Sequence, residues 1–190
     1  MRLSAKQYQQ LIAGSRSSGD PERRLRGKQN REMGEMFEAA IDAACEYYSR
    51  TNHAEIEKTP EGMKRLERMQ GGRFICCFLP RSQPDYKGTL QGGRAVNFEA
   101  KHTVTDRIEA SRLKPEQINK LNRHAQLGSV CFVILGFSYQ DFYRVPWDEW
   151  KEMADRKGHR YVTPAELEEH RIPGDMGMVL FLDGLENRNE

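Results

Sequence analysis

The stretch Pro84–Thr103 reads PDYKGTLQGGRAVNFEAKHT, and its pattern decides the fold. It opens with an acidic residue, Asp85, closes with Glu99 and Lys101, and has a glycine pair in the middle. A three-residue turn at Gln91–Gly93, with a glycine last, joins two antiparallel strands because glycine readily takes the left-handed conformation of such hairpins. In that register Asp85 faces Glu99 across the strand pair, with Cβ atoms about 4.5–5.5 Å apart.

Strand alternation assigns the side chains that follow the turn to two faces. Successive side chains of a strand point to opposite sides, so Glu99 and Lys101 share one face with Asn97. The alternating residues Val96, Phe98 and Ala100 then point to the opposite side, toward the core. The pattern therefore predicts two carboxylates and a lysine on one patch of surface.

Two carboxylates at this distance repel each other unless a proton or a cation offsets their charge. Oxygen ligands of this kind suit Mg²⁺, with Mn²⁺ as a substitute, and bound Mg²⁺ can activate water or bridge to a phosphate. Lys101 beside the metal could orient the attacking water and stabilise charge on the phosphoryl oxygens. The pattern favours phosphodiester hydrolysis. The alternative is a surface hairpin with an ordinary salt bridge, since acid-x-Lys also occurs at Asp85–Lys87 and elsewhere.

Length and composition are typical of one globular domain. The chain has 190 residues, of which 37% are hydrophobic and 31% charged, and no apolar run approaches the ~20 residues of a membrane span. The N-terminus lacks the apolar core of a secretory signal, so we expect a cytoplasmic protein with no membrane partner. The four cysteines have apolar or aromatic neighbours and no zinc-binding spacing, which favours reduced core residues.

Charge is distributed unevenly along the chain. Residues 1–31 hold eight Lys or Arg against two acids, so this segment has a net charge of +6. The whole chain has a net charge of only +2, so the remainder is acidic. Gly, Ser, Pro and charged residues mix in 13–30 without apolar periodicity, which predicts a flexible basic arm over 1–30. The ordered domain is then 31–190, and it contains the pattern that favours a nuclease. Such an arm favours a polyanion such as nucleic acid, and the alternative is a solvated tail.

The remaining patterns predict an α/β fold, with a mixed sheet flanked by helices. The first predicted helix carries an apolar face at three- and four-residue steps: Met33, Phe37, Ile41, Ala44 and Tyr48. Downstream segments predict strands at RFICCFLP, SVCFVILGF, DFYRVP and MVLFLDGL, and helices at KPEQINKLNRHAQ, WDEWKEMADRKG and TPAELEEH. The order of helices and strands indicates a mixed sheet.

The pattern Pro84-Asp85 followed by Glu99-x-Lys101 resembles the PD-(D/E)xK nucleases. DYKGTLQGGRAVNFEAKHT is similar to the matching stretch of RecU-type Holliday junction resolvases, and the likeness runs over roughly residues 28–185, through MGEMFEAAIDAACEYY, IEKTP, EQINKL and YVTPAELEEHRIP. The resemblance implies a restriction-endonuclease-like core with a protruding basic stalk at about 60–73. It also implies a Mg²⁺-dependent, structure-selective endonuclease, a homodimer that resolves four-way junctions in DNA recombination and repair.

The resemblance also implies roles for individual residues. Glu38 corresponds to a helix acid that completes the active site, Lys58 to a basic residue near the site, and Gln117 to a glutamine that positions substrate or water. The implied catalytic residues are therefore Asp85, Glu99, Lys101, Glu38 and Gln117, with Asp85 and Glu99 as metal ligands. The basic residues expected to bind DNA are Arg23, Arg24, Arg26, Lys28, Arg31, Lys58, Lys64, Arg65 and Arg68.

Two departures from the family pattern have consequences. Residues 81–83 read Arg-Ser-Gln where the family has more hydroxyl residues, so a hydroxyl contact to metal or phosphate there is in doubt. His102 replaces a common acid, and we interpret it as structural. A restriction-like or repair nuclease on the same fold, or a DNA-binding protein without catalysis, stays open as an alternative.

Overall fold

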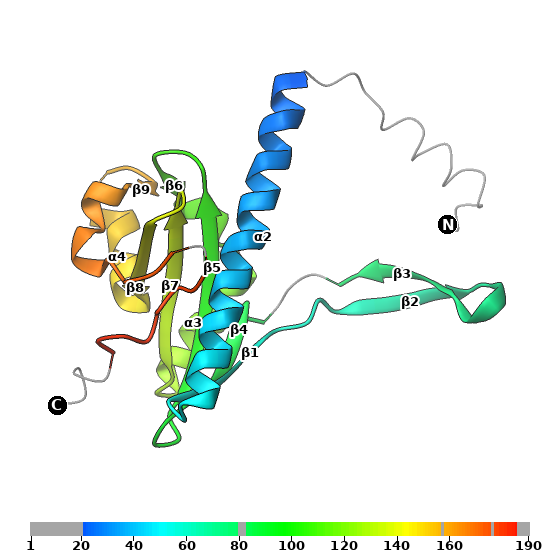
Figure 1. Ribbon diagram of the computed structural model, residues 1–190, viewed down its shortest axis with the longest axis horizontal. Coiled ribbons are helices and arrows are strands. Elements are labelled where there is room, and N and C mark those ends of the chain that lie inside the picture. Colours follow the sequence, from blue (N-terminus) through cyan, green and yellow to red (C-terminus); the bar gives the residue numbers. More distant parts are fainter. Residues whose placement is uncertain (1–20, 80–82, 157, 176, 186–190) are drawn as a thin grey trace. The chain divides into compact units, whose positions relative to one another are not determined.

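The computed structural model describes residues 21–190 except 80–82, 157, 176 and 186–190 (Figure 1). The chain forms two compact units, Met1–Glu32 and Met33–Glu190, and helix α2 (Pro21–Arg50) contributes residues to both. No helix within the described ranges is long and apolar enough to cross a membrane. The second unit contains the sheet and every residue of the predicted catalytic set.

Helix α2 begins earlier than the sequence pattern predicted. Residues 21–30 are helical, whereas we expected an irregular arm through Asn30. A proline suits the first turn of a helix, and Lys28 and Glu32 form an i, i+4 ion pair at 3.5 Å that supports the helix. The residues before Pro21 lie outside the described ranges, and the functional boundary between arm and domain stays a prediction.

The main sheet has five strands in the order β1-β4-β5-β7-β8. Their bounds are β1 Ala54–Lys58, β4 Tyr86–Leu90, β5 Ala95–Thr103, β7 Val130–Phe137 and β8 Asp141–Pro146. All neighbours pair antiparallel except β5 and β7, which are parallel and are connected through helix α3 (Pro115–Gln126). This arrangement confirms the predicted mixed sheet. The sequence pattern did not predict the polar edge strand β1, because Glu-x-Glu-Lys has few of the apolar residues that indicate a strand.

The predicted β4–β5 hairpin is confirmed in its register. Tyr86 pairs with Phe98, and the Leu90 N–H donates to the Arg94 carbonyl oxygen at 2.8 Å. Gly93, the last residue of the turn, has a φ of 89°, the left-handed conformation that favours glycine. One more step in this register places Asp85 opposite Glu99.

Each face of the sheet packs against a separate hydrophobic layer. Residues 33–50 of α2 cover the face that carries Phe98 and Phe132, and the predicted apolar positions of this helix are all buried. Helix α3 and helix α4 (Trp147–Arg156) cover the other face, where Leu121 and Trp150 pack on β7 and β8. Since Glu99 points to the face under α3, both sides of β5 are covered.

The stretch RFICCFLP does not join the main sheet, which corrects the prediction. Its strand β3 (Phe74–Phe78) pairs with β2 (Met63–Arg68) in a separate two-stranded sheet, with η1 (Gln70–Gly72) at the turn. This hairpin contains most of the predicted stalk and extends past residue 73. Cys76 is consequently exposed rather than in the core, like all of β2 and most of β3. An apolar run predicts a strand but not its pairing partner.

The C-terminal part differs in detail from the prediction. The stretch MVLFLDGL forms turns and a single bridge between Gly174 and Val179 instead of a strand, yet Val179 and Phe181 are fully buried. TPAELEEH forms two short 3₁₀ turns instead of one helix. The remaining elements are η3 (Pro164–Glu166), η4 (Glu168–His170), η2 (Ala110–Arg112), β6 (Ile108–Glu109) and β9 (Tyr161–Val162), the last two paired in a small sheet.

Candidate active site

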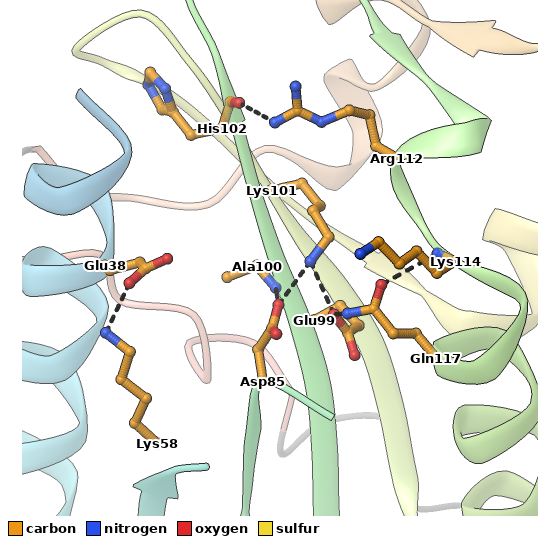
Figure 2. A network of polar contacts seen from close by, with 10 residues as sticks. All are labelled: Glu38, Lys58, Asp85, Glu99, Ala100, Lys101, His102, Arg112, Lys114 and Gln117. Atoms are coloured by element: carbon orange, nitrogen blue, oxygen red, sulfur yellow. Dashed lines mark hydrogen bonds and ion pairs between the residues drawn. The ribbon is translucent and has the colours of Figure 1, made fainter. Parts of the chain in front are cut away.

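Three predicted residues meet at the start of β4 and the middle of β5. The Lys101 ammonium donates to Asp85 Oδ2 at 2.7 Å and to Glu99 Oε2 at 2.8 Å (Figure 2). The backbone N–H of Ala100 also donates to Asp85 Oδ2, at 3.3 Å. The hairpin register and strand alternation together produce this geometry.

The site is more deeply buried than the sequence indicated. The Glu99 side chain is 0% exposed, and those of Asp85 and Lys101 are only 12% and 13% exposed. The expectation of a surface patch is therefore wrong in this respect. The physical reason is helix α3, whose first turn covers the face of β5 that carries Glu99.

Gln117 provides the contact from α3. Its side-chain Nε2 donates to Glu99 Oε2, and its Oε1 accepts from the backbone N–H of Lys114 at 3.1 Å (Figure 2). Pro115 opens the helix, so Gln117 lies in the first turn, and its side chain is held at both polar atoms. The structure thus brings Gln117 into the same group as Asp85, Glu99 and Lys101.

Burial and the neighbouring charges shift the pKa values of the two carboxyl groups in opposite directions. Burial raises the pKa of Glu99 to about 8; the nearby Asp85 adds to this rise and the Lys101 ammonium opposes it. Burial also acts to raise the pKa of Asp85, but the Lys101 charge and several hydrogen bonds outweigh it and hold that pKa below its usual value. Without a metal, Asp85 is therefore the ionised partner and Glu99 is the group that takes up a proton.

The residues fit a hard divalent cation. Glu99 Oε1 is buried and has no hydrogen-bond partner among the described residues, while Oε2 is taken by Lys101 and Gln117. A buried carboxylate oxygen without a partner is costly, and a metal ion would satisfy it. Asp85 supplies a second carboxylate, which accepts from the same Lys101 ammonium. Carboxylate oxygens are the donors that Mg²⁺ prefers.

Glu38 and Lys58 lie at the same cavity as Asp85 but form a separate pair. The cavity has a volume of about 410 Å³, and all three residues line it. The Lys58 ammonium donates to Glu38 Oε2 at 2.7 Å, apart from the Lys101 group (Figure 2). The structure thus brings both residues near the site, and the role of Glu38 in completing it stays a prediction.

The basic residues expected to bind DNA occupy three places. Lys58 is at the cavity; Lys64, Arg65 and Arg68 are exposed on β2, where the Arg65 guanidinium lies 4.5 Å from the centre of the Phe74 ring. Arg24, Lys28 and Arg31 are exposed on the part of α2 that belongs to the first unit. The side chains of Arg23 and Arg26, and the departure at residues 81–82, lie outside the described residues.

Two further residues, His102 and Asp42, contact elements that border the site. The His102 ring is buried against Phe37 and its Nε2 lies 2.9 Å from the Ser138 carbonyl oxygen, which agrees with a structural role. Asp42, which sequence reasoning missed, accepts a hydrogen bond from Tyr86 at 2.7 Å and lies 3.7 Å from Lys58. The sequence could have indicated Asp42 by its position four residues after Glu38, which places both acids on the same face of the helix, one turn apart.

Comparisons with known proteins agree with the sequence resemblance. The family model RecU, described as Recombination protein U, matches residues 32–187. Curated relatives named Holliday junction resolvase RecU, from Streptococcus pneumoniae strains Hungary19A-6 and CGSP14, are each 33% identical over 120 residues. The match covers 60% of this chain and spans 60% of the length of each relative. A solved structure, the Holliday junction resolvase Hjc from Archaeoglobus fulgidus, matches with 12% identity and a TM-score of 0.46, over 76% of this chain and 97% of that one.

Proposed function

Since the chain belongs to the RecU (Recombination protein U) family, we propose that it is a metal-dependent endonuclease that resolves four-way Holliday junctions in recombination and repair. One observation carries the catalytic part of this proposal. Asp85 and Glu99 flank the Lys101 ammonium, and a buried Glu99 oxygen is left without a partner among the described residues. The name of the relatives, Holliday junction resolvase RecU, supports the choice of junction DNA as substrate.

Asp85 and Glu99 would hold Mg²⁺, with Mn²⁺ as a substitute. When bound, the ion supplies Lewis-acid activation of water and neutralises charge on the phosphoryl group. Gln117 holds Glu99 Oε2 and thereby leaves Oε1 for the ion. Lys101 then orients the attacking water and donates to a phosphoryl oxygen as negative charge develops there.

The basic surfaces supply affinity rather than chemistry. Lys58 at the cavity would contact the phosphate beside the scissile bond. The β2–β3 hairpin, with Lys64, Arg65 and Arg68 exposed, would act as the stalk that enters the branch point, and the basic arm would add phosphate contacts. A homodimer with one Asp85–Glu99 site per subunit would match the approximate two-fold symmetry of a four-way junction.

The proposal predicts that Asp85→Ala and Glu99→Ala abolish cleavage while junction binding stays nearly intact. The metal ligands serve the chemical step, whereas affinity comes from basic residues elsewhere. The measurement is cleavage and gel-shift binding of a labelled four-way junction beside the matching duplex, with Mg²⁺ and with EDTA. Asp106→Ala, an exposed acid in the turn after β5, is the matched control and should cleave like the wild type.

Each outcome of this experiment decides between alternatives. Cleavage by either variant at the wild-type rate would overturn the metal-site assignment. Equal cleavage of junction and duplex would favour a restriction-like or repair nuclease on the same fold. Junction binding by the wild type without cleavage, in either Mg²⁺ or Mn²⁺, would leave a DNA-binding protein without catalysis.

A further inference from the structure

Lys58 lies between two carboxylates that are one turn apart on α2. Its ammonium is 2.7 Å from Glu38 Oε2 and 3.7 Å from Asp42 Oδ2. Asp42 has a second contact as well, because the Tyr86 hydroxyl donates to Asp42 Oδ1 at 2.7 Å. One carboxylate of α2 therefore contacts both the last residue of β1 and the first residue of β4.

These two strand ends are paired with each other and border the cavity. Lys58 and Tyr86 are register partners in the β1–β4 ladder, and Tyr86 directly follows Asp85. The Tyr86 ring is buried and stacks on Phe98 with centroids 4.8 Å apart. A contact that orders Lys58 and Tyr86 thus acts next to the proposed metal ligand Asp85.

The two carboxylates differ in what they face. Glu38 lines the cavity together with Asp85, whereas Asp42 does not line it. If Glu38 turns toward metal-bound water or substrate during the reaction, Lys58 loses its nearer partner. Asp42 is then the group that keeps the ammonium, a compact charge on a flexible four-carbon stem, at the cavity rim.

We propose that Asp42 is a positioning residue for the cleavage reaction, holding the Lys58 ammonium at the cavity rim and the hydroxyl of Tyr86, the residue after Asp85. This inference rests on the proposed function, since it assigns Lys58 to a phosphate of the scissile strand. The half-exposed Asp42 carboxylate repels DNA, so its removal leaves junction affinity equal or higher while it slows cleavage. A purely structural role would not separate affinity from rate in this way.

Asp42→Asn tests the proposal because asparagine keeps an oxygen acceptor for Tyr86 and removes the charge that holds Lys58. Its single-turnover cleavage rate at saturating protein should fall on the order of tenfold, since loss of orientation alone has effects of this size or larger. Junction affinity should not weaken. Asp42→Glu should recover part of the rate.

Two controls separate positioning from a general charge effect. Glu46→Gln makes the same change of charge one turn further along α2, on an exposed side chain, and should cleave at the wild-type rate. In a Lys58→Met background, Asp42→Asn should cause no further loss of rate, because coupled residues are not additive. A wild-type rate for Asp42→Asn, or an undiminished effect in the Lys58→Met background, would overturn the proposal.

A measurement that does not depend on cleavage tests the role of Asp42 separately from the proposed nuclease function. Nuclear magnetic resonance of ¹³C-methylated lysines follows the titration of Lys58 in Glu38→Gln and in two double variants that also carry Asp42→Asn or Asp42→Ser. If Asp42 holds the ammonium by itself, the pKa of Lys58 is higher in Glu38→Gln than in either double variant, since burial lowers that pKa in all three. Equal Lys58 pKa values with and without the Asp42 carboxylate would refute the positioning role even if the wild type cleaves no DNA, and Asp42→Ser serves if Asp42→Asn does not fold. Absence of wild-type cleavage alone would refute only the nuclease proposal.

Discussion

Glu99 combines full burial with three polar neighbours, and this combination defines the chemistry of the site. Its Oε2 atom is bonded to Lys101 and Gln117, while Asp85 lies on the other side of the same ammonium. Burying a carboxylate is costly unless it is paired or protonated, so the group responds to pH and to metal ions. Its proton and a metal ion compete for the same oxygens.

The raised pKa of Glu99 predicts a pH-dependent stability of the metal-free protein. The folded pKa of about 8 exceeds the unfolded value near 4.5, so the native state binds a proton that the unfolded state has released between these values. This contribution to the free energy of unfolding is fully present below about pH 4.5 and is lost as the pH rises through about 8. Glu99→Gln carries no such proton, so the difference in unfolding free energy, wild type minus variant, should fall over that window.

Urea unfolding in EDTA at several pH values measures this difference. Asp106→Asn, with an exposed side chain, serves as the control and should parallel the wild type. Parallel curves for the wild type and Glu99→Gln would show that Glu99 is already ionised in the folded protein at neutral pH.

At the scale of elements, strands β1 and β4 approach each other closely at Gly88. A Cβ atom at this position would lie 2.1 Å from the Glu55 carbonyl oxygen and 2.7 Å from the Ile56 Cα, both backbone atoms. The glycine therefore permits the pairing that brings Lys58 beside Tyr86, two residues before Gly88. The geometry of the cavity rim depends on this close contact.

We expect Gly88→Ala to destabilise the protein by about 1–3 kcal/mol, the usual cost of forcing a methyl group into a packed region. Displacement of β1 should also move Lys58 and slow cleavage. Gly34→Ala is the matched control, since nothing lies within 4 Å of an added Cβ and the residue is inside α2. It should stabilise the helix by about 0.5–1 kcal/mol. Denaturant unfolding of both variants checks the prediction, and wild-type stability of Gly88→Ala would contradict it.

At the scale of the whole molecule, resolution of a junction requires two nicks on opposed strands. One chain has one Asp85–Glu99 pair and hence one site. A two-fold dimer supplies two sites related in the same way as the two strands to be cut.

The dimer proposal predicts that a heterodimer of wild type and Glu99→Ala nicks one strand of a junction and stops. Each subunit serves a single strand, so the inactive subunit leaves its strand intact. Two affinity tags allow the heterodimer to be purified, and a cruciform plasmid distinguishes a nicked circle from a linear product. Linear product formed within one binding event, or a strictly monomeric active protein, would contradict the proposal.

The amino-acid sequence by itself determined the features that depend on local geometry. The glycine turn sets the register of β4 and β5, and that register with the two-residue alternation brings Asp85, Glu99 and Lys101 together. Helical periodicity likewise identified the buried face of α2 from Met33 onward. These features need only contacts between residues close in sequence.

The tertiary structure alone decided which layers meet. The burial of Glu99 requires α3 to pack on β5, and the contact with Gln117 joins residues 18 positions apart, with the end of β5, β6 and η2 between them. The pairing of β3 with β2 instead of the main sheet, and the contact of Asp42 with both Lys58 and Tyr86, have the same origin. Local patterns specify an element and its apolar face, but the partner of that face follows from the packing of the whole chain, in which many alternative pairings have similar local energies.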